Sequence, residues 1–483
     1  MQNDKNPTLE YSYTSLPNIF YQFATAALLP KPEIVLRNDA LFNDLKMTLD
    51  NDEAILSYFF NQKSEEQNTS FAQAYAGHQF GHFNKLGDGR AIVMGEFVSP
   101  NHQRFDIQLK GSGRTPYSRN GDGKATLKAM LREYLISEAM HHLKIPTSRS
   151  LFVVKSGELV QREKNHEGAV LGRLLKSHIR VGTFEFALHF GSTEDLQALT
   201  NYTIHRLYPE LESEENPVLE FLKKVMEMQI DLVVNWMRVG FIHGVMNTDN
   251  ISISAETFDY GPCAFMNAYH PDTVFSSIDT QGRYAFGNQP NIIKWNMARF
   301  AESLLPILDQ NEEESLKLAQ SVFDAFDDLW HRKYYETMGN KIGLQIENEG
   351  MPFLVDELFE MMKKHQMDFT NTFLNLMDIL DADHYSEQNL DFQQWIEKWK
   401  YNIDNTNGLV DAKTRMKASN PVFIPRNHLV EEALENAARG DMNLYHQLLN
   451  VLSNPYEHQP DLERFMQPSD ANFERQYQTF CGT

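Results

Sequence analysis

Side chains able to bind a metal ion gather in residues 240–261, GFIHGVMNTDNISISAETFDYG. This stretch reads as a polar loop flanked by strands. Asn250 stands in the loop, and Asp259 follows nine residues later. Because hard cations such as Mg²⁺ prefer oxygen ligands, an amide and a carboxylate at this spacing are candidate metal ligands. Asp249 lies beside Asn250, and from the residues alone it is interpreted as an N-cap or turn residue in NTDN.

The elements around this stretch follow the order found in the lower lobe of a protein kinase. Helical patterns cover residues 221–238 before it and residues 291–308 after it. A kinase catalytic loop reads H-R-D-x-x-x-x-N and its metal loop reads D-F-G. Here the loops read H-G-V-M-N-T-D-N and D-Y-G, so Val245 takes the place of the catalytic Asp. Since valine cannot accept a proton, the protein is either an inactive kinase or one that uses its nucleotide differently.

A glycine-rich segment precedes the predicted strand 91–97. It reads Gly87-Asp-Gly89-Arg90. Glycines let the backbone approach a ligand closely, and an arginine adds a charge that suits phosphate. Alone, such a segment is more often a plain turn.

Residues 104–110, RFDIQLK, alternate between apolar and polar side chains and predict a half-buried strand that ends at Lys110. Glu133 lies within a predicted helix over residues 124–143. In kinases, a strand lysine binds nucleotide phosphates and pairs with a helix glutamate. The spacing leaves two alternatives open. Lys110 and Glu133 form an ion pair, or Lys110 is solvated and Glu133 is a surface charge paired with a helix neighbour such as Arg132 or Lys128.

A local basic cluster stands in AVLGRLLKSHIRVGTFEF. Its members are Arg173, Lys176, His178 and Arg180. Binding a triphosphate requires such a cluster. The alternative is that these are surface cations paired with the many carboxylates of the chain.

The rest of the chain is interpreted as packing and helices. Residues 1–70 carry no recognisable chemistry, and residues 262–289 resemble a kinase activation loop. Residues 420–427, NPVFIPRN, form a predicted extended linker. Further helices are predicted at 38–60, 311–330, 352–365, 369–382, 387–399, 428–438 and 441–452.

Composition restricts the class of protein. The chain has 483 residues and a net charge of −22, so nonspecific binding to nucleic acid or to an anionic membrane is not expected. The N-terminus has no secretory signal pattern, and no run reaches the ~18 apolar residues of a membrane span. Two cysteines, Cys263 and Cys481, exclude a disulfide scaffold and suit a reducing cytoplasm.

Taken together, the motifs resemble the selenoprotein O family of kinase-fold protein adenylyltransferases. The motifs that carry the resemblance are YAGHQFGHF, LGDGRA, QLKGSGRTPYSR, GDGKA, SHIRVGTFE, GFIHGVMNTDN, Asp-Tyr-Gly and NPxxIPRN. The resemblance implies an α+β, protein-kinase-like two-lobed fold with an N-terminal extension and additional C-terminal helices. The corresponding domains are an extension (1–75), an N-lobe with nucleotide-binding loops (76–190), a helical C-lobe (191–425), and C-terminal helices with a tail (426–483).

The resemblance also implies the activity. Members of the family bind ATP turned around relative to ordinary kinases, and they transfer AMP to Ser, Thr or Tyr hydroxyls of other proteins. Some bacterial members transfer UMP from UTP, and Mg²⁺ or Mn²⁺ is required. The expected partners are protein substrates, redox-related proteins among them, with neither nucleic acid nor membrane. The alternatives are an atypical protein kinase and an inactive ATP-binding scaffold.

The family's functional residues are carried over onto matching positions of this sequence. Asp249 is expected to be the proton acceptor, and Asn250 and Asp259 the metal ligands. Glu133 is expected to orient Lys110. The residues expected to contact the nucleotide are Gly87, Gly89, Arg90, Lys110, Asp122, Gly123, Arg173, Arg180 and Asp259.

One departure concerns the cysteines. In bacterial members a cysteine in the activation-like loop is able to pair with the C-terminal cysteine, but Phe275 occupies that place here. A disulfide between Cys263 and Cys481 is therefore a hypothesis, and its alternative is that Cys263 is a small buried apolar residue.

Overall fold

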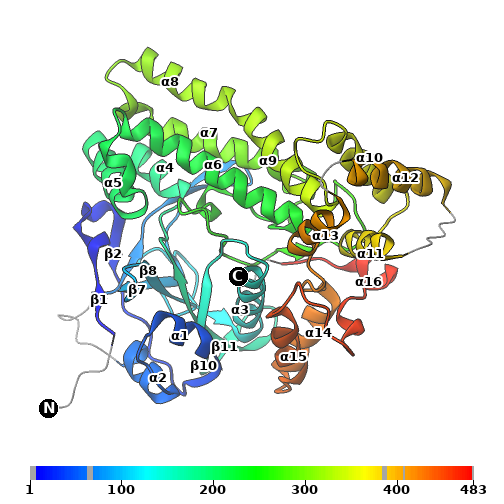
Figure 1. Cartoon of the computed structure of the whole chain (residues 1–483). Helices are drawn as coiled ribbons and strands as arrows, with labels where there is room; N and C mark the ends of the chain where they lie inside the picture. The colour runs from blue at the N-terminus through cyan, green and yellow to red at the C-terminus, as the bar shows by residue number, and fades with distance from the viewer. Residues whose placement is uncertain (1–6, 62–68, 383–388, 406–407, 481–483) are drawn as a thin grey trace.

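The computed structural model of the chain describes residues 7–61, 69–382, 389–405 and 408–480. An antiparallel sheet dominates the first part of the chain and helices dominate the rest (Figure 1). The main sheet follows the order β2-β4-β7-β8-β11-β10-β3, with β1 beside β7 and β9 beside β11. Its strands are β1 (Leu9–Glu10), β2 (Tyr21–Phe23), β3 (Glu33–Arg37), β4 (Phe71–Gln73), β7 (Ala91–Val98), β8 (Arg104–Lys110), β9 (Ala125–Thr126), β10 (Arg149–Gln161) and β11 (Asn165–Leu175).

Helices cover both faces of this sheet. On one face, α3 (Leu127–His142) packs against β10 and β11, and the Thr126 side chain caps its N-terminus by accepting from the Ala129 amide. On the other face lie α1 (Asp39–Leu45) and α2 (Asp52–Phe60), which bury a second apolar cluster against the sheet. The sheet is therefore enclosed, and α3 is held firmly enough to position a side chain.

The second part of the chain is helical. Its helices are α4 (Val181–Phe190), α5 (Thr193–Leu207), α6 (Pro217–Arg238), α7 (Gln289–Leu308), α8 (Glu312–Asp324), α9 (Phe326–Lys341), α10 (Met351–Lys364), α11 (Phe369–Asp381), α12 (Leu390–Asp404), α13 (Gly408–Ser419), α14 (Asn427–Ala438), α15 (Asn443–Leu452) and α16 (Ala471–Gln476). Between α6 and α7 in the chain, the short strands β12 (Phe241–Ile242) and β13 (Ala264–Phe265) pair, and they hold the polar loop between them. A second small pair, β5 (Ala76–Gln79) with β6 (His82–Lys85), lies against α4.

This architecture confirms the α+β class and the protein-kinase-like two-lobed fold. A sheet lobe carries the helix α3, and a helical lobe carries the loops between α6 and α7, as the sequence predicts. Strands from residues 7–73 join the same sheet as strands from residues 91–175. The division of the chain at residues 75, 190 and 425 stays a prediction. No helix in the described ranges is both long and apolar enough to cross a membrane.

Some expectations about individual elements are wrong. The helix predicted over residues 38–60 is two helices, because Lys46 ends α1 in the left-handed conformation (φ 52°) and Asn51 caps α2. The strand over residues 104–110 has the predicted bounds as β8, but it is not half-buried. Its polar face is buried too, since Asp106 is 3% exposed and Gln108 0%. That face contacts charged partners from β11, α3 and α5 instead of water.

Candidate active site

Four charged side chains form a network between the two lobes, in which three are buried and the Asp259 side chain is 24% exposed. Lys110, at the end of β8, places Nζ 2.5 Å from Oε2 of Glu133 on α3 and 2.5 Å from Oδ1 of Asp259. Arg173 on β11 donates through Nη1 to Oε1 of Glu133 at 2.6 Å and to Oδ1 of Asp259 at 2.7 Å. Of the two alternatives left open by the spacing, the ion pair between Lys110 and Glu133 is the one present.

The network keeps Asp259 ionised. Burial alone would raise the pKa of the Asp259 carboxyl, but Arg173, Lys110 and Arg180 outweigh it and hold this pKa well below its ordinary value. Asp259 also has positive φ (62°), an uncommon backbone conformation for a residue other than glycine. The sharp turn directs the carboxylate toward the two cations.

Arg180 connects the sheet lobe to the polar loop. It is 2% exposed and precedes α4. Its Nη1 donates to the backbone carbonyl of Asp249 at 3.1 Å, and its Nη2 lies 3.5 Å from Oδ1 of Asp88. The guanidinium also stacks over the Tyr75 ring, 4.0 Å from the centroid. Arg180 is thus fixed from three sides, as a residue that positions phosphate should be.

Asp249 presents a carboxyl with unused hydrogen-bonding capacity. Its Oδ1 is buried and has no hydrogen-bond partner among the described residues. Burial raises the pKa of Asp249 to about 6, although Arg180 opposes the shift. The loop that carries Asp249 packs closely against β5. A Cβ on Gly77 would lie only 2.3 Å from Oδ1 of Asp249. A carboxyl held this way is suited to accept a proton.

One cavity of about 380 Å³ brings most of the expected site residues together. Val245 lines this cavity as well, so no carboxylate enters it from the position of the kinase catalytic Asp. The volume lies within the usual range for small-ligand sites. The expected residues that line it are Gly89, Arg90, Lys110, Arg173, Arg180, Asp249, Asn250 and Asp259.

Gly87, Asp122 and Gly123 do not line this cavity; they shape the loop beside it. A Cβ on Gly87 would lie 2.4 Å from Cγ of Tyr117, and one on Gly123 would lie 2.1 Å from the carbonyl oxygen of Gly113. Asp122 pairs with Arg162 at 2.8 Å, and this hydrogen bond is the main cause that lowers the pKa of Asp122. In this conformation these three residues maintain the backbone of residues 113–123.

Asn250 and Asp259 fit a hard divalent cation that also has phosphate ligands. Both line the same cavity, and the Asn250 amide nitrogen donates to the Val245 carbonyl at 3.0 Å, which leaves the amide oxygen available. No group of three or more His, Cys, Asp or Glu that could hold a metal ion exists among the described residues. A site of one carboxylate and one amide oxygen suits Mg²⁺, which usually keeps water and substrate phosphate among its ligands.

The structure divides the basic cluster of the sequence into parts. Arg173 and Arg180 line the cavity, whereas Lys176 lines a different one. His178 is buried between them, and its backbone amide donates to Oδ2 of Asp106 at 2.7 Å. The alternative of surface cations is therefore wrong for the two arginines, which are 2% exposed each.

Sequence reasoning missed three residues of the site. Gln108 accepts from Arg173 through Oε1, at 2.9 Å from Nε and 2.7 Å from Nη2. Asp88 faces Arg180, and Tyr75 stacks on it. Two signals were available: Asp88 stands between the two glycines of GDGR, and Gln108 shares the polar face of its strand with Lys110.

The cysteine hypothesis concerns one described and one undescribed residue. Cys263 is fully buried, and burial raises the pKa of its thiol to about 11. Cys481 lies outside the described residues. The tail just before it contacts the activation-like loop, where the Thr479 amide donates to the Phe275 carbonyl at 2.8 Å. A buried thiol with a raised pKa is a poor nucleophile, which weighs against Cys263 as a disulfide partner.

Comparisons with known proteins give one consistent family. Residues 5–453 match the family described as "Protein adenylyltransferase SelO". A protein from Brevibacillus brevis named "Protein nucleotidyltransferase YdiU" is 50% identical, covering 99% of this chain and 100% of its own. The protein of the same name from Pelagibacter ubique is 49% identical, with 98% of each chain covered.

Among solved structures, one match is ROP2 from Toxoplasma gondii, described as a virulence factor with a protein-kinase fold and no enzymatic activity. It is 11% identical, covers 75% of this chain and 95% of its own, and has a TM-score of 0.24. So low a TM-score carries no argument about this chain.

Proposed function

The chain belongs to the SelO family of protein adenylyltransferases, and from this premise we propose that its 380 Å³ cavity binds ATP and transfers AMP to Ser, Thr or Tyr hydroxyls of protein substrates. As a protein nucleotidyltransferase it uses a nucleotide and acts on proteins. The hydroxyl oxygen attacks the α-phosphorus, the bond to the bridging oxygen breaks, and pyrophosphate leaves. Redox-related proteins remain among the proposed targets, and UTP remains a proposed second donor.

The basic residues of the cavity serve the phosphates. In-line attack concentrates negative charge on the α-phosphate and on the leaving pyrophosphate, and fixed cations in a partly buried site stabilise that charge. Arg173, Arg180 and Lys110 are held in place by buried partners, so little reorganisation is needed when charge develops. Gly89 and Arg90 line the same wall, and Glu133 orients Lys110. Gly87, Asp122 and Gly123 are proposed to contact the nucleotide through the loop that they shape.

Asn250 and Asp259 are the proposed metal ligands, with Mg²⁺ or Mn²⁺ as the ion. Such an ion, when bound, neutralises charge on the phosphates. Asp259 would exchange its ion pairs with Lys110 and Arg173 for this role, which frees both cations to contact phosphate.

Asp249 is the proposed general base. Asp249 lines the cavity, and its carboxyl is proposed to accept the proton of the attacking hydroxyl there. A positioned base contributes ~10²–10⁴-fold to such a step. The observation that carries the proposal is this placement: the free carboxyl is on Asp249, while Val245 contributes an apolar surface at the position of the kinase base.

The test uses ATP labelled in parallel at the α or the γ phosphate, with purified protein, Mg²⁺ or Mn²⁺, and a protein lysate. We expect label in protein only from α-labelled ATP, and α-labelled UTP in a third arm tests the second donor. Mass spectrometry of labelled bands identifies the targets and the modified hydroxyls. Label from γ would indicate a kinase, and ATP binding without any transfer would indicate a scaffold; either result overturns the proposal.

A further inference from the structure

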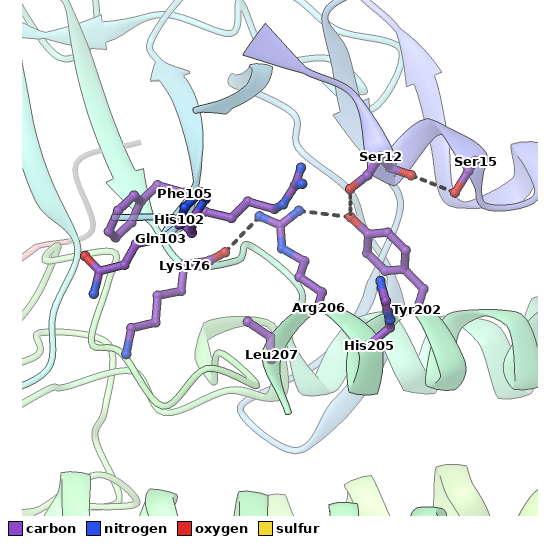
Figure 2. A pocket seen from close by; sticks show the side chains of 11 residues that line it. Ser12, Ser15, His102, Gln103, Phe105, Lys176, Tyr202, His205, Arg206 and Leu207 are labelled. Carbon is purple, nitrogen blue, oxygen red and sulfur yellow. Dashed lines mark hydrogen bonds between the residues drawn. The ribbon is translucent and has the colours of Figure 1, made fainter. Parts of the chain in front are cut away.

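A second cavity, of about 520 Å³, lies at the other end of β8. Whereas Lys110 at the end of this strand lines the catalytic cavity, Arg104 and Phe105 at its start line the second one. The remaining walls come from the N-terminal segment around Ser12 and from the last turn of α5 (Figure 2). Nothing in the proposed transfer reaction uses this cavity.

The charges that reach this cavity are positive, although the chain as a whole carries −22. Its lining includes the basic side chains of Arg104, Lys176 and Arg206, together with His102 and His205, and it includes no Asp or Glu. A concentration of cations in one concave site of an acidic protein is what an anionic ligand requires.

The floor of the cavity is built from buried groups. Arg206 is only 3% exposed at its side chain, and it donates to Oδ1 of Asp106 at 2.5 Å, to the Tyr202 hydroxyl at 2.9 Å and to the Lys176 carbonyl at 2.8 Å. Figure 2 shows this guanidinium between Tyr202 and Lys176. Its Nε is buried and has no acceptor among the described residues, so one strong donor is left unsatisfied.

Two acidic partners, Glu96 and Asp106, lie behind the arginines, whereas a third, Glu10, is 53% exposed at its side chain and pairs with Nη2 of Arg104 at 2.6 Å. Glu96 is 0% exposed and accepts from Arg104 at 2.6 Å and from the Ser12 hydroxyl at 2.6 Å. Asp106 is buried on the polar face of β8 beneath Arg206. Glu96 and Asp106 therefore fix the two guanidinium groups while their own oxygens stay buried, and the exposed Glu10 also holds Arg104.

Lys176 completes the cationic surface. It is exposed, and its ammonium forms no ion pair with any residue of the described ranges. It belongs to the basic cluster of the sequence, but the catalytic cavity does not include it. Its charge acts on the buried Glu256 carboxyl, where Lys176 opposes the rise in pKa that burial causes, so a ligand would bind without the loss of a salt bridge.

We propose that this pocket, formed by Arg104, Lys176 and Arg206, is a second anion site that binds a small molecule carrying a phosphate or diphosphate group. Three cationic groups from different walls match the several oxygens of a phosphate better than the two of a carboxylate. The volume exceeds that of a lone phosphate and lies in the range of sites for small organic ligands.

Equilibrium dialysis with inorganic phosphate, inorganic pyrophosphate and ADP, in separate arms, tests this site on the full chain. Lys176→Gln is compared with wild type and with Lys417→Gln, which changes an exposed lysine on α13. We expect wild type and Lys417→Gln to bind one equivalent more than Lys176→Gln, or to bind it about tenfold or more tightly. The compound that binds most tightly among phosphate, pyrophosphate and ADP shows which phosphate group the site prefers.

Equal stoichiometry and affinity in all three proteins would overturn the proposal, since any binding would then belong to the catalytic cavity alone. Because Lys176 is exposed, its substitution leaves the packing intact, and an unchanged thermal unfolding midpoint checks this. Binding in this assay needs no AMP transfer, so its failure is distinct from a failure of the proposed function.

Discussion

The Nζ atom of Lys110 lies 2.5 Å from Oδ1 of Asp259, so the proposed metal ligand of the helical lobe is paired with the proposed phosphate-binding lysine of the sheet lobe. Arg173 contacts the same oxygen at 2.7 Å. Two fixed cations on one carboxylate keep it ionised, and both would stay in the proposed phosphate site if Asp259 held a metal ion. This pairing joins the two lobes at the point where the reaction is proposed to occur.

Replacing Asp259 with Asn tests the metal site. The amide has the same size but no charge, so it holds a divalent cation weakly and leaves Lys110 and Arg173 paired with Glu133 but without the second carboxylate. We expect AMP transfer to fall by about 10²-fold or more. The measurement is incorporation of α-labelled ATP over a range of Mg²⁺ and Mn²⁺ concentrations. Asp272→Asn, in an exposed part of the following loop, is the matched control and should keep full activity. Full activity in Asp259→Asn would refute the assignment.

Replacing Asp249 with Asn tests the general base. The substitution conserves shape in a place where Gly77 allows no extra atom, so the fold should be retained. Because the amide cannot accept the proton, transfer should slow by about 10²–10⁴-fold while the affinity for ATP stays nearly unchanged. Single-turnover transfer and ATP binding are measured on the same preparation. Loss of ATP binding together with activity would show that Asp249 has a structural role.

The sequence predicts much of this site because its chemistry is local. Lys110, Asn250 and Asp259 stand in short motifs, and the bounds of β8 follow from a strict alternation. What the sequence does not show is pairing. Gln108 accepts hydrogen bonds from Arg173 because the register of β8 and β11 places these two residues opposite each other. The sequence of either strand alone does not predict that register.

The burial of polar side chains is the second property that the sequence does not predict. A polar strand face predicts contact with water when its partners are unknown, but here α3, α5 and β11 supply the partners. The left-handed Lys46 that divides the first predicted helix is equally invisible, because lysine has no preference for that conformation. Both failures come from tertiary contacts that override local pattern.

The two glycines at 121 and 123 offer a test of the loop beside the cavity. Gly123 has φ 71°, and a Cβ there would lie 2.1 Å from the Gly113 carbonyl oxygen. At Gly121 the nearest atom to such a Cβ is the Ser118 carbonyl oxygen at 3.1 Å, and φ is not in the left-handed region. We expect Gly123→Ala to destabilise the protein by about 1 kcal/mol or more and to weaken nucleotide binding, with a smaller effect for Gly121→Ala. Thermal unfolding and ATP titration measure both. Equal effects of the two substitutions would contradict this role for Gly123.

Glu185 provides a pH-dependent prediction. It lies on α4, with Oε1 2.6 Å from Nδ1 of His78 on β5, and burial raises its pKa to about 7. Arg299 opposes this shift, whereas Asp249 and Glu302 add to it. The unfolded chain has a Glu pKa of about 4.3, so the folded state binds the proton more tightly. The stabilisation that comes from the raised Glu185 pKa is complete below about pH 4.3, and it is lost as the pH rises through about 7.

Glu185→Gln imitates the protonated carboxyl and should remove this dependence. Between pH 6 and pH 8.5 we expect the stability of the variant, relative to wild type, to increase by about 1 kcal/mol. Unfolding midpoints at the two pH values measure it. Burial lowers the pKa of His78 from its ordinary value, which favours the neutral form of the neighbouring imidazole. Glu397→Gln, at an exposed side chain on α12, is the control and should show no such change. A constant difference between Glu185→Gln and wild type at both pH values would mean that Glu185 is ionised throughout, with its charge held by His78 and Arg299.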